Sequence, residues 1–324
     1  MEISYKKYSE EFRKDWDSFI ETSINGNFLH SRSFYDQNDQ NVLEDYSIIF
    51  YKKNKIIALF PALLIVEDKK RILNSYFRAT YGGVIVSDKV GVKEALDIID
   101  LIVQISRNDK INEVIIRNPF RILNKAFVDE IDYALWFHGF SINYREIEVA
   151  IKLDLDTSKV RSKYDNGTKY NVKKALSLVS CTESTDYKLF WNILNKNLND
   201  KHDVNPVHSL IDFKKLIELI GNDKIKLFTA TYDNNIVCGL VAFVFENVIH
   251  AQYIGVDYDF QELRPINALI DYIIEWGCKR DLKYFNLGTA NFNNGKGVNE
   301  GLFHFKESFG GRGVIRESMS LIIE

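Results

Sequence analysis

The sequence predicts an α+β fold (α/β layered) with two domains, each a mixed, mostly antiparallel sheet flanked by helices. The chain has 324 residues, enough for about two domains of roughly 150 residues each. Its 46% hydrophobic and 27% charged residues, with a net charge of -3, describe a globular chain that can bury sizeable cores. The order helix, hairpin, strand, helix, strand occurs in the first half and recurs in the second. We therefore expect similar domains over residues 1–150 and 151–324.

In the first half, Phe12, Trp16, Phe19 and Ile20 have helical spacing and predict an amphipathic helix over residues 8–21. The polar turn at residues 52–54 predicts a hairpin of strands 47–51 and 55–66. The remaining predictions for this half are a strand over 77–86, a helix over 92–107 and a buried strand over 112–117.

In the second half, we expect helices over 168–178, 185–198, 213–220 and 266–279. Strands are expected over 224–232, 236–246, 248–256, 284–287 and 316–323, with the first turn at residues 233–235. The domain boundary is placed near 148–158, where a strand-like run gives way to a polar segment. Because no proline-rich or low-complexity linker separates the halves, a packed body is expected rather than a flexible tether.

Composition narrows the possible classes of protein. No apolar run approaches the roughly 18 residues of a membrane span, and the N-terminus has no apolar segment behind its lysines, so neither a membrane span nor a secretory signal is expected. Cys181, Cys238 and Cys278 are isolated, which favours a reducing cytoplasm over disulfides or a zinc site. The slightly acidic balance gives no support for binding to DNA.

A motif near the C-terminus is the most informative part of the chain. Residues 285–289 form a strand-like run with a glycine turn, and residues 299–311 then place Lys306 between phenylalanines before a glycine pair. A lysine in partly apolar surroundings could stabilise an oxyanion or bind a phosphate, which makes Lys306 the first catalytic candidate. The alternative is a pairing with Glu307 or a backbone carbonyl. If the segment is extended, His304 points to the same side as Lys306 and could relay a proton.

The motif N-L-G, followed by G-L-x-x-F-K-x-x-F-G-G, resembles the FemAB-like branch of the GNAT acyltransferase superfamily, which includes aminoacyl-tRNA-dependent peptidoglycan transferases. Residues 169–175 resemble a second pattern of this branch, R-x-x-[IV]-[RK]-K-A, with Lys169 in place of arginine. Residues 81–83 resemble its Y-G-G strand. The resemblance implies tandem GNAT-like domains and places Lys306 at the channel for the acyl donor.

Arg264 and Pro265 begin a helix whose first N–H groups could bind an anion. The resemblance implies that Arg264 and Asn267 lie where GNAT enzymes hold the pyrophosphate of coenzyme A, although the glycines of the usual [QR]-x-x-G-x-[GA] pattern are absent. A plain proline-started helix with a solvated Arg264 is the alternative. Asn286, Gly288 and Thr289 could offer backbone groups and a hydroxyl to the same ligand, or form only a tight turn.

Substrate-binding candidates lie in both halves. Lys169 and Lys173 share a predicted helical face with Arg161 and Lys163 upstream, and could hold phosphates of a nucleotide-linked precursor or a tRNA end. They could equally be solvated helix lysines.

The strand over 248–256 supplies Tyr253, which could line the acceptor pocket, protonate a leaving group or simply pack in the core. The resemblance also implies that Lys201 and His202 approach the acceptor, and that Arg78 and Tyr81 frame its cleft. No third ligand stands at a suitable spacing from His202 and His208, so no metal site is expected.

No G-x-S-x-G, Walker, H-E-x-x-H or dinucleotide-binding motif is present, which removes the main support for hydrolase, NTPase and dehydrogenase functions. The sequence favours a cytoplasmic bacterial N-acyltransferase that acts on a small-molecule or nucleotide-linked precursor of the cell envelope or of a polysaccharide. No tightly bound cofactor is expected, and acyl-CoA is the expected co-substrate. Two alternatives stay open, an aminoacyl-tRNA-dependent transferase and a non-catalytic GNAT-fold binding protein.

Overall fold

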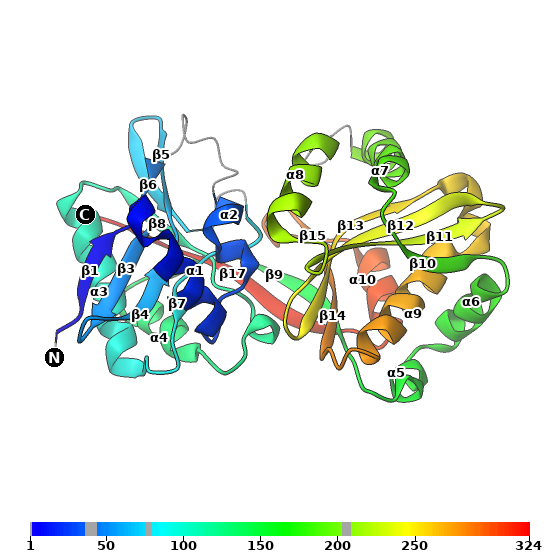
Figure 1. Ribbon diagram of the computed structural model, residues 1–324, viewed down its shortest axis with the longest axis horizontal. Coiled ribbons are helices and arrows are strands. Elements are labelled where there is room, and N and C mark those ends of the chain that lie inside the picture. Colours follow the sequence, from blue (N-terminus) through cyan, green and yellow to red (C-terminus); the bar gives the residue numbers. More distant parts are fainter. Residues whose placement is uncertain (1, 36–43, 76–78, 203–208) are drawn as a thin grey trace. The chain divides into compact units, whose positions relative to one another are not determined.

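The computed structural model describes residues 2–35, 44–75, 79–202 and 209–324, without the side chains of 198–202 (Figure 1). The chain forms two compact units, one of Met1–Glu146 with Ile315–Glu324 and one of Ile147–Val314. It passes between the units within the strands β9 (Ser141–Lys152) and β17 (Arg312–Ile322). The predicted boundary at residues 150 and 151 falls within β9.

The first unit contains two sheets and four α-helices among its described residues. One sheet has the strand order β1-β3-β4-β7. The other sheet contains consecutive strands in the order β17-β8-β6-β5-β2. Its strands are β1 (Ser4–Lys7), β2 (Glu44–Asp45), β3 (Ile48–Lys52), β4 (Lys55–Phe60), β5 (Leu63–Glu67), β6 (Lys70–Asn74), β7 (Ile85–Val86) and β8 (Glu113–Ile116). Its helices are α1 (Arg13–Thr22), α2 (Arg32–Tyr35), α3 (Val92–Asn108) and α4 (Asp129–Phe137), with 3-10 turns at Glu10–Phe12, Phe28–His30 and Arg121–Leu123.

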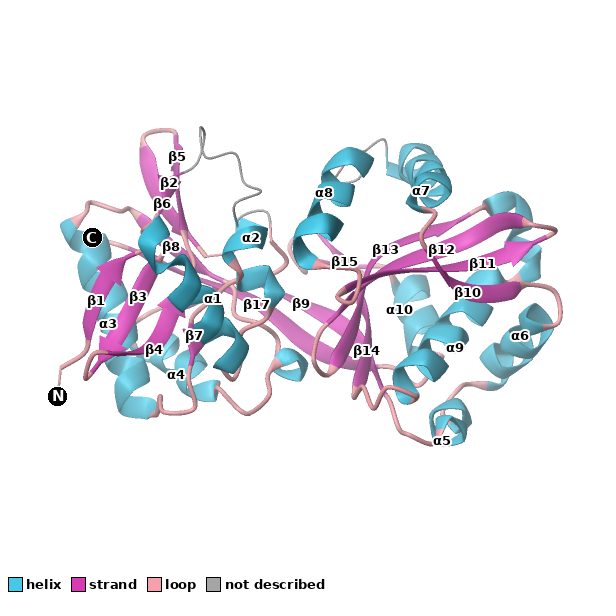
Figure 2. Cartoon of the chain, viewed as in Figure 1, coloured by secondary structure: helices cyan, strands magenta, loops and turns pink. Residues whose placement is uncertain are grey.

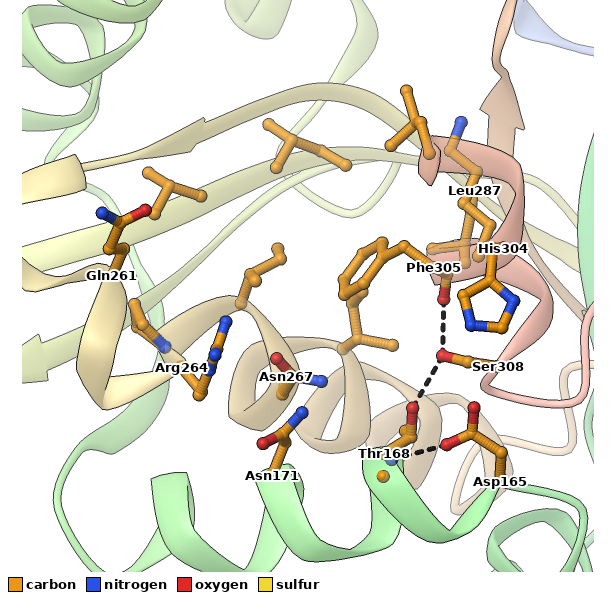
Figure 3. Close-up of a pocket in the computed structure, with 18 of the residues that line it drawn as sticks. Asp165, Thr168, Asn171, Gln261, Arg264, Asn267, Leu287, His304, Phe305 and Ser308 are labelled. Carbon is orange, nitrogen blue, oxygen red and sulfur yellow. Dashed lines mark hydrogen bonds between the residues drawn. The ribbon is translucent and has the colours of Figure 1, made fainter. Parts of the chain in front are cut away.

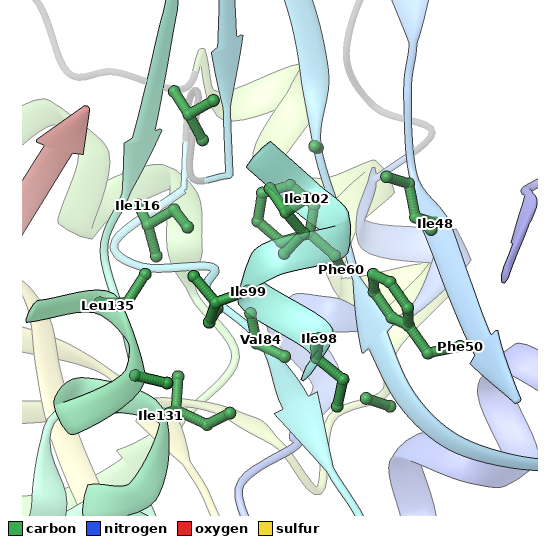
Figure 4. Packing of buried hydrophobic residues seen from close by; sticks show 14 of the residues in the cluster. Ile48, Phe50, Phe60, Val84, Ile98, Ile99, Ile102, Ile116, Ile131 and Leu135 are labelled. Atoms are coloured by element: carbon green, nitrogen blue, oxygen red, sulfur yellow. The ribbon is translucent and has the colours of Figure 1, made fainter. Parts of the chain in front are cut away.

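Apolar side chains on both faces of β3 contribute to the core of this unit, because successive side chains of a strand point to opposite faces of the sheet. Ile48 and Phe50 pack in one apolar cluster with Ile98 of α3 (Figure 4). Ile49 packs instead with Trp16 of α1. The helices α3 and α1 therefore cover opposite faces of the sheet.

The second unit has one large sheet, of order β10-β11-β12-β13-β14-β9, in which only β13 and β14 run parallel among the described pairs. Its strands are β10 (Ser180–Ser184), β11 (Ile225–Tyr232), β12 (Asn235–Val244), β13 (Val248–Val256) and β14 (Tyr284–Thr289), with a small hairpin of β15 (Asn291–Phe292) and β16 (Gly297–Val298). Its helices are α5 (Thr157–Ser162), α6 (Asn166–Leu176), α7 (Tyr187–His202), α8 (Leu210–Ile220), α9 (Pro265–Cys278) and α10 (Glu300–Glu307), with a 3-10 turn at Tyr258–Leu263.

The helices α9 and α7 cover opposite faces of this sheet (Figure 2). Leu240 of β12 belongs to the same apolar cluster as Ile273 of α9. A Cβ added to the preceding residue, Gly239, would lie 2.3 Å from the ring of Phe190 on α7. Consecutive residues of β12 thus face different helices, as the two-residue period of a strand requires.

This layered, mostly antiparallel arrangement confirms the predicted fold class.

Several elements differ from their predicted form. The strand predicted over 55–66 is divided into β4 and β5, since Pro61 lacks the N–H that would continue the ladder. Of the strand predicted over 77–86, only β7 forms within the described residues. The segment around Lys306, for which the sequence left the conformation open, is the helix α10.

Candidate active site

A pocket of about 710 Å³ lies in the second unit, where β13 and β14 stop pairing. The two strands are paired in parallel only from Val248 and Tyr284 to His250 and Asn286, although both continue further. The register of β13 against β12 also shifts just beyond this point, which leaves an extra residue at Gln252. The end of this pairing opens the sheet, and side chains from β13, β14, α6, α9 and α10 line the space.

The pocket is polar at both ends, and between them apolar side chains lie opposite Asn171 and Asn267 (Figure 3). Figure 3 shows Gln261 and Arg264 at one end and His304 and Ser308 at the other. The apolar walls between these ends come from Ile254, Val256, Ile266, Ile270, Leu287 and Phe305. A pocket of this form suits an elongated ligand with a charged end and an apolar body.

The N-terminus of α9 provides one polar end. Pro265 occupies the first turn, and Arg264 before it has left-handed backbone angles, with φ of 57° and ψ of 41°. Pro265 has no N–H, and the N–H of Asn267 donates to the carbonyl of Arg264 at 3.0 Å, so the helix dipole is the main backbone contribution, with partial positive charge at this end. Together with the exposed guanidinium of Arg264, this end of the pocket can bind an anion.

At the opposite end, α6 is tied to α10 by side-chain hydrogen bonds (Figure 3). The Asp165 carboxylate caps α6 by accepting the N–H of Thr168 at 2.6 Å. The Thr168 hydroxyl donates to Ser308 Oγ at 2.6 Å, and the Ser308 hydroxyl donates to the carbonyl of Phe305 at 2.7 Å. These pocket residues were not predicted from the sequence, although the spacing of Asp165 and Thr168 is that of a helix N-cap and its N3 residue.

Lys306 lies on α10 with only 5% of its surface exposed. Its ammonium donates to the carbonyl of Gly288 at 3.0 Å and to that of Thr289 at 2.6 Å, which joins α10 to the end of β14. Lys306 therefore bonds to backbone carbonyls, which was one of the alternatives considered from the sequence. It also lines the pocket.

The condition under which His304 and Lys306 would point to one side, an extended segment, is not met. Asn299 caps α10 by accepting the N–H of Leu302, and the segment from Glu300 onward is helical. Side chains two residues apart on a helix diverge by about 200°. His304 is consequently exposed while Lys306 is buried, although both contribute atoms to the pocket.

The glycine pair after α10 is required by the backbone. Gly310 has φ of 79°, a conformation that L side chains rarely adopt. A Cβ at Gly311 would lie 2.9 Å from the carbonyl oxygen of Lys306 and 2.5 Å from Cγ1 of Val149. The pair lets the chain turn closely behind Lys306 and enter β17.

A buried polar row lies beside Lys306 on the strands β9, β14 and β13. Asn286 and Glu148 are fully buried, and the Asn286 amide donates to Glu148 Oε2 at 2.6 Å. Asn286 Nδ2 also lies 3.1 Å from Nδ1 of His250, while its Oδ1 accepts the N–H of Gly288 at 3.0 Å. The row thus fixes the turn whose carbonyls hold Lys306.

Strand alternation places Asn286 away from the pocket. Leu287 lines the pocket, so its neighbour Asn286 faces the other side of the sheet. Gly288 and Thr289 do not appear among the lining residues either. Of the predicted coenzyme-binding set, Arg264 and Asn267 are at the pocket, whereas Asn286, Gly288 and Thr289 shape the turn beside it.

Other predicted residues lie elsewhere. The ring of Tyr253 packs against Trp191 of α7 and Phe213 of α8, with centroids 5.6 and 5.9 Å away, and does not line the pocket. Lys169 and Lys173 are exposed on α6, where Lys169 donates to the carbonyl of Ser162. The side of α6 that faces the pocket carries Thr168 and Asn171 instead.

Arg161 was expected to share a face with Lys169 and Lys173. It is bound to the buried carboxylate of Asp271 at 2.6 Å and to Glu275 at 2.8 Å, which joins α5 to α9. The hydrogen bond to Asp271, opposed by burial, raises the pKa of the Arg161 guanidinium. Its charge is thus already neutralised within the unit.

In the first unit, Tyr81 is buried against the rings of His30 and Phe120, each 5.6 Å away between centroids. Arg78 lies outside the described residues, as do the side chains of Lys201 and His202. Among the described residues, no group of three or more His, Cys, Asp or Glu side chains could hold a metal ion. None of the helices in the described segments has both the length and the apolar character to cross a membrane.

Comparison with known proteins identifies the pocket-bearing part of the chain. Residues 158–306, which include nearly all of the pocket lining, match the acetyltransferase (GNAT) domain family. This part of the chain is therefore similar to GNAT acetyltransferase domains. No curated protein matches this chain in sequence.

Solved structures support the fold over almost the full length. A structure of FemX has a TM-score of 0.72 at 11% identity and covers 98% of this chain and 97% of its own. L-PGS from Bacillus licheniformis has a TM-score of 0.58 at 14% identity, with coverage of 95% and 90%. A tandem GNAT protein from the clavulanic acid biosynthesis pathway has a TM-score of 0.57 at 7% identity, with coverage of 100% and 99%. At these identities, the similarities concern the fold alone.

Proposed function

We propose that this protein transfers an acyl group from acyl-CoA to an amino group of a cell-envelope or polysaccharide precursor. The observation that carries the proposal is the pocket where β13 and β14 stop pairing, with the α9 N-terminus and Arg264 at one end and with Lys306 of α10 in its lining. This pocket lies in the part of the chain that matches the acetyltransferase domain family.

The shape and chemistry of the pocket favour acyl-CoA as the donor. The pyrophosphate would bind at the N-terminus of α9, next to the guanidinium of Arg264. The linear arm of coenzyme A would lie along the apolar side chains of Ile254, Val256 and Leu287.

The reaction in this proposal needs positioning and charge stabilisation more than covalent catalysis. The neutral amine of the acceptor attacks the carbonyl carbon of the thioester, and a C–N bond forms while the carbonyl oxygen becomes an oxyanion. Collapse of this intermediate breaks the C–S bond, the thiolate leaves, and the proton lost by the amine passes to the solvent. The buried charge of Lys306 would stabilise the oxyanion, while the row of Asn286 and Glu148 holds the turn that positions Lys306.

The acceptor class rests on the FemAB-like sequence motif and on the similarity of fold to FemX. A structure of a putative lysylphosphatidylglycerol synthetase domain shares the fold as well, with a TM-score of 0.58 at 11% identity. Amide formation with acyl-CoA would take place in the cytoplasm, where that donor is available. Aminoacyl-tRNA is the alternative donor that the sequence motif implies.

The test is calorimetric titration of the purified protein with acetyl-CoA and with free coenzyme A. Saturable binding is expected, and a ligand at 100 times its dissociation constant should stabilise the protein by about 2.7 kcal/mol. Arg264→Ala should weaken the binding, whereas Arg107→Ala, which removes an exposed arginine on α3, should leave it unchanged.

Three outcomes separate the candidate functions. Binding that depends on Arg264 supports the acyl-CoA proposal. Failure to bind coenzyme A, together with turnover of an aminoacyl-tRNA, would assign the alternative donor. Failure with both donors would favour a binding protein without catalytic activity.

A further inference from the structure

A second pocket in the unit of Ile147–Val314, of about 470 Å³, carries a concentration of positive charge. Three of its lining residues, Lys152, Lys163 and Arg312, are basic and none is acidic. The remaining lining residues are Ala150, Tyr284, Gly310 and Val314. The positive charge of this pocket contrasts with the net charge of -3 of the whole chain.

The three basic residues come from different elements whose backbones are fixed. Lys152 ends β9, where it is paired with Tyr284 of β14. Gly310 approaches Lys163 so closely that an added Cβ would lie 2.7 Å from the Lys163 Cβ. Arg312 begins β17 directly after the glycine pair. Rigid anchors of this kind lower the entropy cost of gathering the side chains around a ligand.

The charges of these residues are not neutralised within the unit. In the part of the chain that the structure describes, no salt bridge involves any of the three, in contrast to Arg161 with its partner Asp271. Like charges that share one pocket repel each other, and a bound anion removes this repulsion. The pocket therefore has the electrostatic character of an anion site.

We propose that this second pocket binds the phosphate group of a small phosphorylated molecule. Arg312 would supply a planar pair of donors to the phosphate oxygens, and Lys152 and Lys163 would supply point charges. The aromatic ring of Tyr284 would contact the carbon skeleton next to the phosphate.

This site is distinct from the acyl-donor pocket. Asp165 and Ser308 line the first pocket, while Lys163 and Gly310 line the second. The segments 163–165 and 308–310 that separate them are joined by a hydrogen bond from the Asp165 N–H to the Ser308 carbonyl at 2.9 Å. Ligands of the two pockets can therefore bind at the same time.

The experiment is calorimetric titration with inorganic phosphate and with glucosamine 6-phosphate. Both titrations are made on the full chain and on the variant Lys152→Gln, Lys163→Gln, Arg312→Gln. The control variant Lys174→Gln, Lys188→Gln, Lys214→Gln removes the same charge from exposed lysines of the same unit that line neither pocket. Thermal unfolding checks that both variants are folded.

We expect binding by the natural chain and the control, and a loss of about tenfold in affinity for each pocket cation removed. Tighter binding of glucosamine 6-phosphate would identify an amino-sugar phosphate as the source, an assignment that rests on the proposed function. Equal affinity for both probes would identify free phosphate as the source. Absence of binding, or equal binding by the pocket and control variants, would overturn the proposal whether or not the protein binds coenzyme A.

Discussion

Arg264 should affect stability through its backbone conformation and ligand binding through its charge, and the two effects can be measured separately. Its left-handed φ of 57° costs a non-glycine residue about 1–2 kcal/mol, whereas glycine adopts it freely. Arg264→Gly should remove this strain, and part of the gain is lost to the greater freedom of glycine in the unfolded chain. We expect Arg264→Gly to be as stable as the natural protein or more stable by up to about 1 kcal/mol, and Arg264→Ala to show no such gain.

Both variants lose the guanidinium at the mouth of the pocket. A charged hydrogen bond to a phosphate contributes about 1.5 kcal/mol or more, so each variant should bind coenzyme A about tenfold more weakly. Arg264→Lys should restore part of the affinity, because it keeps the charge without the planar fork. The difference between the natural protein and Arg264→Ala should shrink as salt is added, since the guanidinium is exposed.

Calorimetry measures the affinities, and thermal unfolding without ligand measures the stabilities. If Arg264→Gly binds coenzyme A as tightly as the natural protein, the α9 backbone alone binds the anion and the role given to the guanidinium is refuted. If Arg264→Gly instead unfolds well below Arg264→Ala, the account of backbone strain is refuted.

Three further predictions follow from the buried contacts. Lys306→Met should abolish turnover and lower the free energy of unfolding by about 2–3 kcal/mol, because the carbonyls of Gly288 and Thr289 lose their charged donor. As a control, this variant should bind coenzyme A with an affinity within about threefold of normal. Unchanged turnover would show that Lys306 takes no part in the reaction. Burial lowers the pKa of His30 to about 4, so its contribution to stability should be constant above about pH 6.5 and fall by about 3 kcal/mol as the pH drops toward 4. Denaturant unfolding of the natural protein and of His30→Gln between pH 4 and 8 tests this, and an equal pH dependence in both would contradict it. Gly311→Ala should lower the free energy of unfolding by about 1–3 kcal/mol, measured with denaturant, because the added Cβ would contact the Lys306 carbonyl. Gly301→Ala is the control, because a Cβ at Gly301 would lie 3.8 Å from its nearest neighbour.

Local signals in the sequence were sufficient for the main elements around the pocket. The strand predicted over 248–256 is β13, and the helix predicted over 266–279 is α9, displaced by one residue at each end. Strand propensity and turn residues mark the first, while a first-turn proline and an apolar repeat mark the second. The candidate residues at the start of α9, Arg264 and Asn267, accordingly line the pocket.

The direction of side chains near the C-terminus could not be predicted from sequence alone. The phenylalanines around Lys306 fit either an extended run or a helix, and the cap at Asn299 decides for the helix. The partners of Lys306 are carbonyls 17 and 18 residues earlier in the chain. Such contacts depend on how α10 packs on β14, which no local pattern encodes.

The sequence by itself determined the layered α+β class, the FemAB-like motif and the lysine at its centre. Only the tertiary structure decided that Asn286 turns away from the pocket, that Glu148 lies 138 residues earlier as its partner, and that Thr168 and Ser308 close one end. The physical reason is the range of the interactions. Propensities, caps and turns act over a few residues, whereas a pocket is formed by strand pairing and helix packing between segments far apart in the chain.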